Sequence, residues 1–292
     1  MKKIVFAVLF FLPAVLKAQS PDVSRIVYSI KDKDTLWMDD YRPQNGGNGI
    51  SIVFVHGGSF TGGDPENQRP FADGMRKLGY RVFVLKYRLY LKGRSFGCET
   101  TLPEKTKAIS TAVDDIVDAS RYLSANAQTL GVDTQRMVLS GSSAGAEAIL
   151  QTLYNPFVSR KAEPPAYGFR YRAAMSFAGA LLDLNPLTAA RAVPLLIFHG
   201  TNDQLVPYET APHRFCKAAD PGWMMMFGPK PISQKMVDLG VPCVQYIYEG
   251  AGHEISSYMF REFTAMDKFL KGVFDGSLNE HEMTLIAPTQ QS

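Results

Sequence analysis

The five residues Gly141-Ser142-Ser143-Ala144-Gly145 decide the fold of this chain. The preceding residues 136–140 have the apolar pattern of a short buried strand, and the following residues 146–154 have the pattern of a helix. A serine flanked by glycines at a strand-to-helix junction is the pattern of a nucleophile elbow, whose strained turn exposes the hydroxyl and leaves no room for side chains at the glycines. The chain contains 24 glycines, so the pentapeptide alone is weak evidence and the surrounding sequence must carry the argument.

The rest of the chain alternates between strand and helix patterns. Nearly continuous apolar runs, typical of strands covered on both faces, occupy residues 50–55, 81–85, 173–177, 193–198 and 244–248. Helix patterns occupy residues 71–78, 112–123 and 260–274. This alternation predicts an α/β fold with a mostly parallel central sheet and helices on both faces.

The first 18 residues have the pattern of a secretory signal peptide. Lys2-Lys3 precedes an apolar run over residues 4–16, and Ala18 is a small residue at a plausible cleavage point. An uncleaved membrane anchor is the alternative. We therefore predict a catalytic domain over residues 19–275, a polar C-terminal tail over 276–292 and a secreted or periplasmic location. No later segment has 18 consecutive apolar residues, so we expect no stable membrane insertion after signal removal.

Charge and cysteine content narrow the possible partners. Three of the 31 Lys and Arg residues lie in residues 1–18, and the other 28 equal the 28 Asp and Glu residues, so nothing indicates nucleic-acid binding. The three cysteines, Cys98, Cys216 and Cys243, allow one disulfide, and we predict Cys216–Cys243 because both lie in the last third of the chain. The alternative is that all three are buried thiols. No cysteine or histidine spacing indicates a metal site.

A serine nucleophile needs a base, an acid that orients the base, and donors for the developing oxyanion. Asp203 follows the apolar run 193–198 directly, at the end of the sheet where ligands gather in α/β folds, and is the predicted acid; Asp183 is its competitor. His253 follows the run 244–248 within Gly250-Ala251-Gly252-His253 and is the predicted base.

The other four histidines have weaker cases as the base. His56 precedes Gly57-Gly58, His199 directly abuts a strand, His213 lies in a helical pattern and His281 lies in the tail. The order of serine, then acid, then histidine favours His253.

The predicted oxyanion donors are backbone N–H groups. His56-Gly57-Gly58-Ser59-Phe60 follows the run 50–55, and Ala144 follows the nucleophile. Glycines in such a loop let the backbone approach a substrate closely, although a plain Gly-Gly turn is the alternative.

With Ser143, Asp203, His253 and this loop in order, the chain resembles the α/β-hydrolase superfamily, and within it the bacterial carboxylesterases related to hormone-sensitive lipase. The resemblance runs from Asp40-Tyr41-Arg42-Pro43 to Phe274. It implies an α/β-hydrolase fold and oxyanion N–H groups at Gly58, Ser59 and Ala144. Ser59 stands where the family commonly has a third glycine, which adds a side chain and a hydroxyl to the acyl pocket. Glu147 is less usual in the helix after the nucleophile. It lies four residues after Ser143, so one interpretation is that it faces the site, but we expect a structural role for it at the helix N-terminus.

The expected function is that of a secreted serine carboxylic ester hydrolase that acts through an acyl-enzyme, without a metal or organic cofactor. The substrate is a small-molecule or carbohydrate-linked ester: acetyl or feruloyl esters of polysaccharides, or short-chain esters. The alternatives are a prolyl oligopeptidase-like peptidase and a non-catalytic binding protein on a hydrolase fold.

Two stretches interrupt the alternation, residues 88–107 and 221–227, and either is a candidate lid or pocket wall. Ordinary core is the alternative for the second stretch. Five aromatic residues are candidates for an apolar acyl pocket or for core: Phe60, Tyr87, Tyr90, Trp223 and Phe227.

Overall fold

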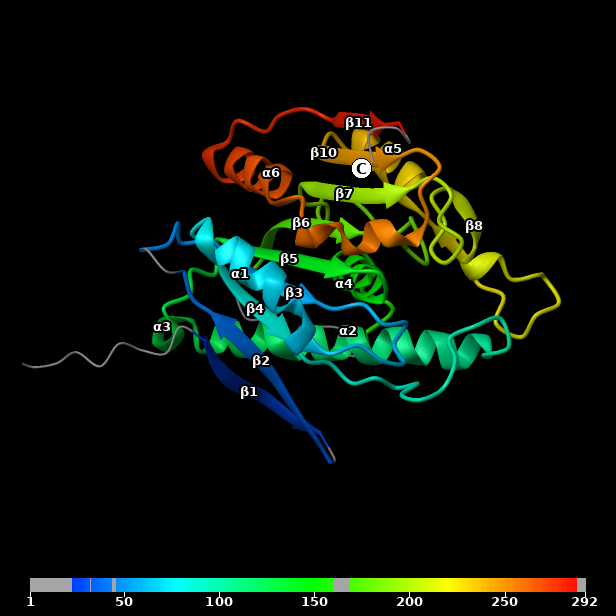
Figure 1. Ribbon diagram of the computed structural model, residues 1–292, viewed down its shortest axis with the longest axis horizontal. Coiled ribbons are helices and arrows are strands. Elements are labelled where there is room, and N and C mark those ends of the chain that lie inside the picture. The colour runs from blue at the N-terminus through cyan, green and yellow to red at the C-terminus, as the bar shows by residue number, and fades with distance from the viewer. Residues whose placement is uncertain (1–22, 32, 44–45, 160–168, 288–292) are drawn as a thin grey trace, which may run out of the picture.

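The computed structural model describes residues 23–31, 33–43, 46–159 and 169–287. The predicted signal peptide, residues 1–18, lies outside these residues. Within them, nine strands form one sheet in the order β1-β2-β4-β3-β5-β6-β7-β10-β11, with helices on both faces (Figure 1). The strands are β1 Val23–Lys31, β2 Asp34–Tyr41, β3 Ser51–Val55, β4 Arg81–Leu85, β5 Met137–Ser142, β6 Tyr171–Phe177, β7 Leu195–Gly200, β10 Cys243–Tyr248 and β11 Glu282–Ile286.

The longer helices cover the two faces of this sheet. They are α1 Arg69–Lys77, α2 Leu102–Ala125, α4 Ala144–Tyr154, α5 Pro229–Asp238 and α6 Phe263–Asp275. Shorter elements are the helix α3 Ala127–Leu130, the 3-10 helices η1 Pro65–Gln68, η2 His213–Phe215 and η3 His253–Phe260, and a separate pair of strands, β8 Thr210–Pro212 and β9 Met225–Phe227.

From β4 to β11 every strand pair in the sheet is parallel, and only the pairs β1–β2 and β2–β4 are antiparallel. Alternate residues of β3 belong to different cores: Val53 belongs to the core that also holds residues of α2, α4 and α5, and Ile52 and Phe54 belong to the core that holds residues of α1, η3 and α6. Both faces are covered, which is why these strands are continuously apolar rather than alternating. All five strands predicted from apolar runs are present, as are the three helices predicted from their periodicity.

The strand β11 lies in the segment predicted as a polar tail. Residues Glu282–Ile286 pair in parallel with β10, so the sheet extends beyond the predicted end of the catalytic domain at residue 275. Met283 and Leu285 remain 60% and 49% exposed. The strand therefore joins the sheet through its backbone and buries little apolar surface, so it has no strong hydrophobic pattern.

The predicted disulfide Cys216–Cys243 is wrong. Cys98 and Cys216 form the disulfide, across 118 residues of sequence, and Cys243 is a buried free thiol. Cys243 begins β10 inside the core, whereas Cys216 follows η2 in a loop that approaches residues 97–100. Nearness in sequence misled the prediction, because this bond joins two loops that meet only in the folded chain.

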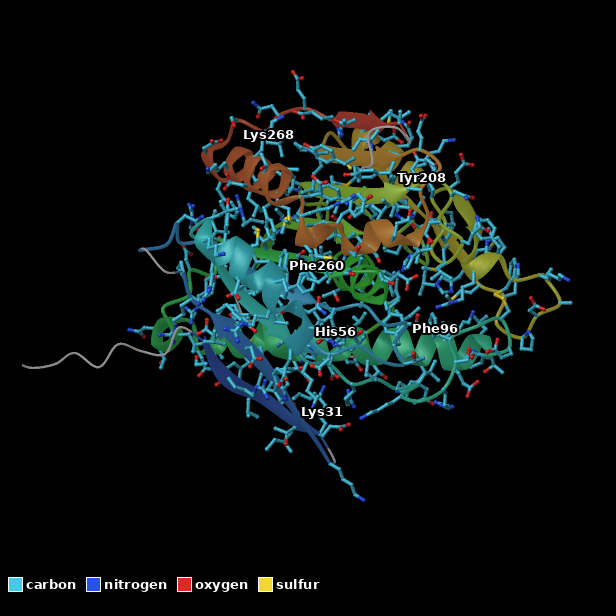
Figure 2. The ribbon with its side chains drawn as sticks, in the orientation of Figure 1. Lys31, His56, Phe96, Tyr208, Phe260 and Lys268 are labelled. Atoms are coloured by element: carbon cyan, nitrogen blue, oxygen red, sulfur yellow. A yellow bond between two sulfur atoms is a disulfide. The ribbon has the colours of Figure 1, made fainter. Side chains whose placement is uncertain are left out.

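The stretch 88–107 is part loop and part helix, because α2 begins at Leu102 after the N-cap Thr101. Gly222 donates a backbone hydrogen bond to Cys98, and Leu102 donates one to Pro221, so the two interrupting stretches lie against each other. Figure 2 shows Phe96 and Tyr208 on the side of the molecule toward which the arrows of β5 and β7 point.

In the described part of the chain, no helix has the length and apolar character needed to cross a membrane.

Candidate active site

Ser143 occupies the sharp turn between β5 and α4. Its φ is +52° and its ψ is −123°, a conformation that is costly for a residue with a side chain. The Ser143 N–H donates to the carbonyl of Phe177 at the end of β6, which holds the turn in place. A β-carbon on Gly141 would lie 2.6 Å from the carbonyl carbon of Gly145, and one on Gly145 would collide with the carbonyl oxygen of Val55. The glycines are therefore required by close packing, as the nucleophile-elbow interpretation predicts.

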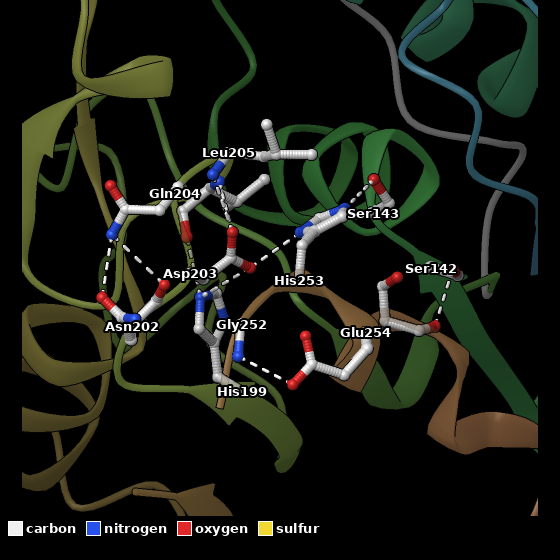
Figure 3. Close-up of polar contacts among 12 residues, drawn as sticks. Ser142, Ser143, His199, Asn202, Asp203, Gln204, Leu205, Gly252, His253 and Glu254 are labelled. Atoms are coloured by element: carbon white, nitrogen blue, oxygen red, sulfur yellow. Dashed lines mark hydrogen bonds and ion pairs between the residues drawn. The ribbon is translucent and has the colours of Figure 1, made fainter. Parts of the chain in front are cut away.

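Ser143, His253 and Asp203 form one hydrogen-bonded chain (Figure 3). The Ser143 Oγ lies 2.7 Å from the His253 Nε2, and the His253 Nδ1 lies 2.7 Å from the Asp203 Oδ2. The Ser143 and His253 side chains are partly exposed and the Asp203 side chain is fully buried. The structure thus brings together all three side chains predicted from sequence, with the geometry of a serine, its base and the orienting acid.

Three parallel strands place these side chains at one edge of the sheet. Ser143 follows β5, Asp203 lies in the loop after β7, and His253 begins η3 after β10. The last two loops are joined by backbone hydrogen bonds from Thr201 to Tyr248 and from Asn202 to Ala251. Parallel strands end at the same edge, so residues 110 positions apart in sequence come within hydrogen-bonding distance.

The Asp203 carboxylate is held in its ionised form. Its Oδ1 accepts backbone hydrogen bonds from Leu205 at 2.8 Å and Val206 at 2.9 Å. Burial acts to raise the pKa of Asp203, but the hydrogen bond and charge of His253 and the nearby His199 outweigh it, so the pKa lies below its usual range. An ionised Asp203 accepts a hydrogen bond from the Nδ1–H of His253, which fixes the tautomer whose Nε2 can accept the proton of Ser143.

His199, one of the weaker candidates for the base, lies next to this carboxylate and below it in the view of Figure 3. Its Nε2 lies 2.9 Å from the carbonyl oxygen of Val206 and 3.6 Å from the Asp203 Oδ2. Burial lowers the pKa of His199, so it is a neutral hydrogen-bond donor in the core and not a base for the serine.

The predicted oxyanion loop lies directly beside Ser143. A β-carbon on Gly57 would lie 3.0 Å from the Ser143 Cβ, which shows how closely the two backbones approach. Gly58, Ser59 and Phe60 have φ values of +118°, +54° and +57°, so the backbone of the loop turns sharply next to Ser143. Among the described residues, the N–H groups of Gly58, Ser59 and Ala144 donate to no other atom. Three donors are thus available to a ligand next to Ser143.

His56 holds this loop and takes no part in the hydrogen-bonded chain. It is 1% exposed, its Nδ1 lies 2.7 Å from the Gly57 carbonyl oxygen, and its ring stacks on Tyr87 at 4.6 Å. The Tyr87 hydroxyl donates to the His56 carbonyl at 2.9 Å, and the backbone N–H and guanidinium of Arg88 bond to the buried Asp115. Tyr87 therefore contacts the oxyanion loop directly, and the next residue, Arg88, is fixed by its bonds to Asp115.

A second histidine–carboxylate pair lies close to the site, and sequence reasoning did not find it. The His213 Nε2 lies 3.2 Å from the Glu147 Oε1, and both side chains are 2% exposed. His213 lies in η2 and not in the predicted helical pattern. Glu147 keeps a structural role, but as the buried partner of His213, one turn after Ser143. The sequence feature that could have indicated this pair was the unusual acidic residue Glu147 early in α4.

Other candidates fall outside the site. Asp183 accepts hydrogen bonds from Asn185 in a local turn and does not contact His253. Ser142 bonds to the Ser256 carbonyl at 2.9 Å. Of the five aromatic residues, Phe60 and Tyr87 are core, Phe227 is partly buried in β9, and Tyr90 and Trp223 are 41% and 38% exposed.

One group of possible metal ligands exists in the described ranges, namely Cys98, Cys216 and Asp220. Its two sulfur atoms are joined in the disulfide, so neither is available as a thiolate ligand.

The sheet order, the elbow after β5 and the site at the carboxyl ends of the strands define an α/β-hydrolase fold, and the predicted fold class is confirmed. Residues 38–159 match the family model described as BD-FAE, and this stretch contains both the oxyanion loop and Ser143.

One curated relative is the ethyl acetate hydrolase of Pseudomonas putida, 29% identical over 134 residues. The match covers 44% of this chain and only 38% of that relative's length.

Solved structures of Thermogutta terrifontis esterase 2 share the fold across most of the chain. The form phosphorylated by paraoxon has a TM-score of 0.64 and 23% identity, and the match covers 88% of this chain and 96% of that one. The propionate-bound form has a TM-score of 0.61 and 22% identity, with 88% and 93% covered. These comparisons confirm the resemblance to bacterial esterases of the α/β-hydrolase type.

Proposed function

We propose that this protein is a serine carboxylic ester hydrolase that acts through an acyl-enzyme. The observation that carries the proposal is the continuous chain from Ser143 through His253 to Asp203, beside a loop with free N–H groups. The relative named ethyl acetate hydrolase and the esterase neighbours support ester bonds as the target.

The residues act in a defined order. His253 takes the proton of the Ser143 hydroxyl as its Oγ attacks the ester carbonyl, and Asp203 stabilises the imidazolium that forms. The N–H groups of Gly58, Ser59 and Ala144 stabilise the oxyanion, and loss of any one of them should cost about 3–4 kcal/mol of transition-state stabilisation. His253 then gives its proton to the departing alcohol, and a water molecule, activated by the same imidazole, hydrolyses the acyl-enzyme.

Short acyl groups are the substrate class that we favour. The relative is named for an acetate ester, and the neighbouring structure holds propionate. Acetyl groups on polysaccharides fall in the same size class. The proposed substrates therefore include acetyl esters of polysaccharides, and we retain feruloyl esters beside them. Export to the periplasm or medium is a further part of it and rests on the pattern of residues 1–18.

The test is hydrolysis of p-nitrophenyl acetate, butyrate and octanoate by the wild type, Ser143→Ala and Ser142→Ala. We expect the short esters to be hydrolysed fastest and Ser143→Ala to lose turnover while keeping its fold. Ser142→Ala is the matched control, because it removes the adjacent hydroxyl, which bonds to the Ser256 carbonyl and not to His253. Activity that survives in Ser143→Ala would refute the proposed nucleophile.

A covalent probe tests the nucleophile without a natural substrate. Paraoxon should transfer its diethylphosphoryl group to the Ser143 Oγ with loss of p-nitrophenolate, as a phosphorylated form exists for the neighbouring esterase. Mass spectrometry of the intact protein should find one adduct in the wild type and in Ser142→Ala. The same adduct in Ser143→Ala would place the reactive group elsewhere.

A further inference from the structure

Arg214 joins the two loops that border Ser143. Its Nη2 donates a hydrogen bond of 2.8 Å to the Ser59 hydroxyl, on the oxyanion loop. Its backbone N–H donates one of 3.0 Å to the carbonyl of Leu205, two residues after Asp203. The guanidinium therefore lies at the edge of the site, and covalent geometry limits the separation of its Nη2 from the Ser59 backbone nitrogen to about 7 Å.

The backbone at Arg214 is strained and firmly anchored. Arg214 and Phe215 have φ values of +56° and +51°, in the left-handed region that residues with side chains rarely adopt. On one side His213 contacts Glu147 of α4, and on the other Cys216 is bonded to Cys98. A strained conformation that is fixed from both ends indicates that the position of this side chain matters.

Among the described residues, the guanidinium of Arg214 forms no ion pair, although its charge contributes to the lowered pKa of the exposed Glu99. Its Nε is buried without a hydrogen-bond acceptor. Lys105, fully buried nearby, donates to the carbonyl of Gly222, and burial together with the charge of Arg214 lowers its pKa. The nearby carboxylates are Glu147, which contacts His213, Glu99, which is exposed, and Asp220, which accepts a hydrogen bond from the Lys217 backbone N–H. A cation with an unused buried donor is the arrangement expected where an anionic group of a ligand binds.

We propose that Arg214 binds a carboxylate on the acyl half of the substrate, so that the enzyme prefers half-esters of short dicarboxylic acids. This inference rests on the proposed esterase function. The leaving oxygen must face His253, which protonates it, so the acyl chain extends along the oxyanion loop toward Ser59 and Arg214. A separation of at most about 7 Å between the Arg214 Nη2 and the Ser59 backbone nitrogen leaves room for an acid of four or five carbons.

The test compares kcat/KM for monoethyl glutarate, ethyl pentanoate, 3-acetoxypropanoate and propyl acetate, measured by acid release. The first two differ in a carboxylate on the acyl half, and the last two differ in a carboxylate on the alcohol half. We expect the wild type to favour monoethyl glutarate over ethyl pentanoate by at least tenfold. Arg214→Gln should lower this ratio at least tenfold. Arg69→Gln is the matched control because it changes an arginine whose side chain is 65% exposed on α1.

Several results would overturn the inference. A wild-type ratio near one would refute it without any variant, and so would an unchanged ratio in Arg214→Gln. An equal fall for both acyl substrates would mean that Arg214 only supports the loop. Preference for 3-acetoxypropanoate over propyl acetate, its uncharged counterpart, with no preference for monoethyl glutarate over ethyl pentanoate, would place the anion on the alcohol side.

The remaining outcomes are also decisive. If Arg214→Gln does not fold, Arg214→Lys keeps the charge but loses the fork of donors, and its ratio should fall below that of the wild type; an unchanged ratio would refute the inference. Failure of the wild type to hydrolyse any of the esters would refute the proposed function itself. Hydrolysis that depends on Ser143 but ignores the carboxylate would refute only the role of Arg214.

Discussion

Gly57 lies so close to the nucleophile that replacing it with alanine tests the oxyanion loop directly. The new β-carbon would lie 2.9 Å from the Ser142 carbonyl oxygen and 3.0 Å from the Ser143 Cβ, whereas ordinary contacts begin at 3.4 Å. The loop and the nucleophile turn must therefore separate by about 0.5 Å, which is the tolerance within which reactive groups must be held. The φ of Gly57 is outside the left-handed region, so the added methyl group is the only defect.

The fall in kcat expected for Gly57→Ala lies between the effect of displacing one oxyanion donor and the effect of removing it. We expect kcat to fall by about 10- to 1000-fold, which corresponds to about 1.4–4 kcal/mol of transition-state stabilisation. KM for p-nitrophenyl acetate should change much less, because the donors act mainly on the oxyanion.

Gly62→Ala is the matched control in the same loop. A β-carbon there has no atom within 4 Å, and the hydrogen bond from the Gly62 N–H to the Gly58 carbonyl is kept. Kinetics of both variants, with melting temperatures to confirm folding, decide the question. A folded Gly57→Ala with wild-type kcat, or an equal loss in Gly62→Ala, would refute the assignment of the oxyanion loop.

Three further predictions concern the acid and the disulfide. Asp203→Asn should lower kcat by about 10³- to 10⁴-fold at an unchanged fold, because the amide no longer holds the His253 tautomer; a loss below tenfold in steady-state assays would contradict this role. Because the pKa of Asp203 is lowered in the folded state, its contribution to stability is present above the usual carboxyl range and is lost as the pH falls through the folded pKa. In urea unfolding from pH 7 to pH 3, the free energy of unfolding of the wild type should therefore fall relative to that of Asp203→Asn. A difference between the two free energies that does not change with pH would refute this dependence on the ionisation of Asp203. Replacing Cys98 and Cys216 by serine should lower the free energy of unfolding, by about 4–5 kcal/mol at most for a loop of 118 residues; a loss under about 1 kcal/mol would mean that the link barely restricts the unfolded chain.

The parts of the molecule that the sequence predicts well are those with a local physical signal. Strands covered on both faces must be continuously apolar, so β3, β4 and β7 were recognisable from composition alone. Ser143, Asp203 and His253 were recognisable because each directly follows such a strand, and strand ends meet at one edge in a parallel sheet.

The parts that the sequence did not predict depend on contacts between distant segments. The β1–β2 hairpin is half-exposed and carries buried charges, such as Asp40 paired with Arg81, which no apolar run signals. The contact between Arg214 and Ser59 joins residues 155 positions apart, and neither residue type indicates the other in advance. The contact between His213 and Glu147 also joins distant segments, and its only signal in the sequence was the unusual acidic residue early in α4.

The placement of the three side chains on different parallel strands also governs when during folding the site comes into existence. The elbow at Ser143 needs β5, α4 and the end of β6, whereas His253 arrives only when β10 pairs with β7. Parallel pairing of strands far apart in sequence is slow, because the chain loses the entropy of the closed loop before the stabilising contacts form. We therefore expect the proposed activity to recover during refolding only once β10 has paired with β7, because before that His253 is not held beside Ser143.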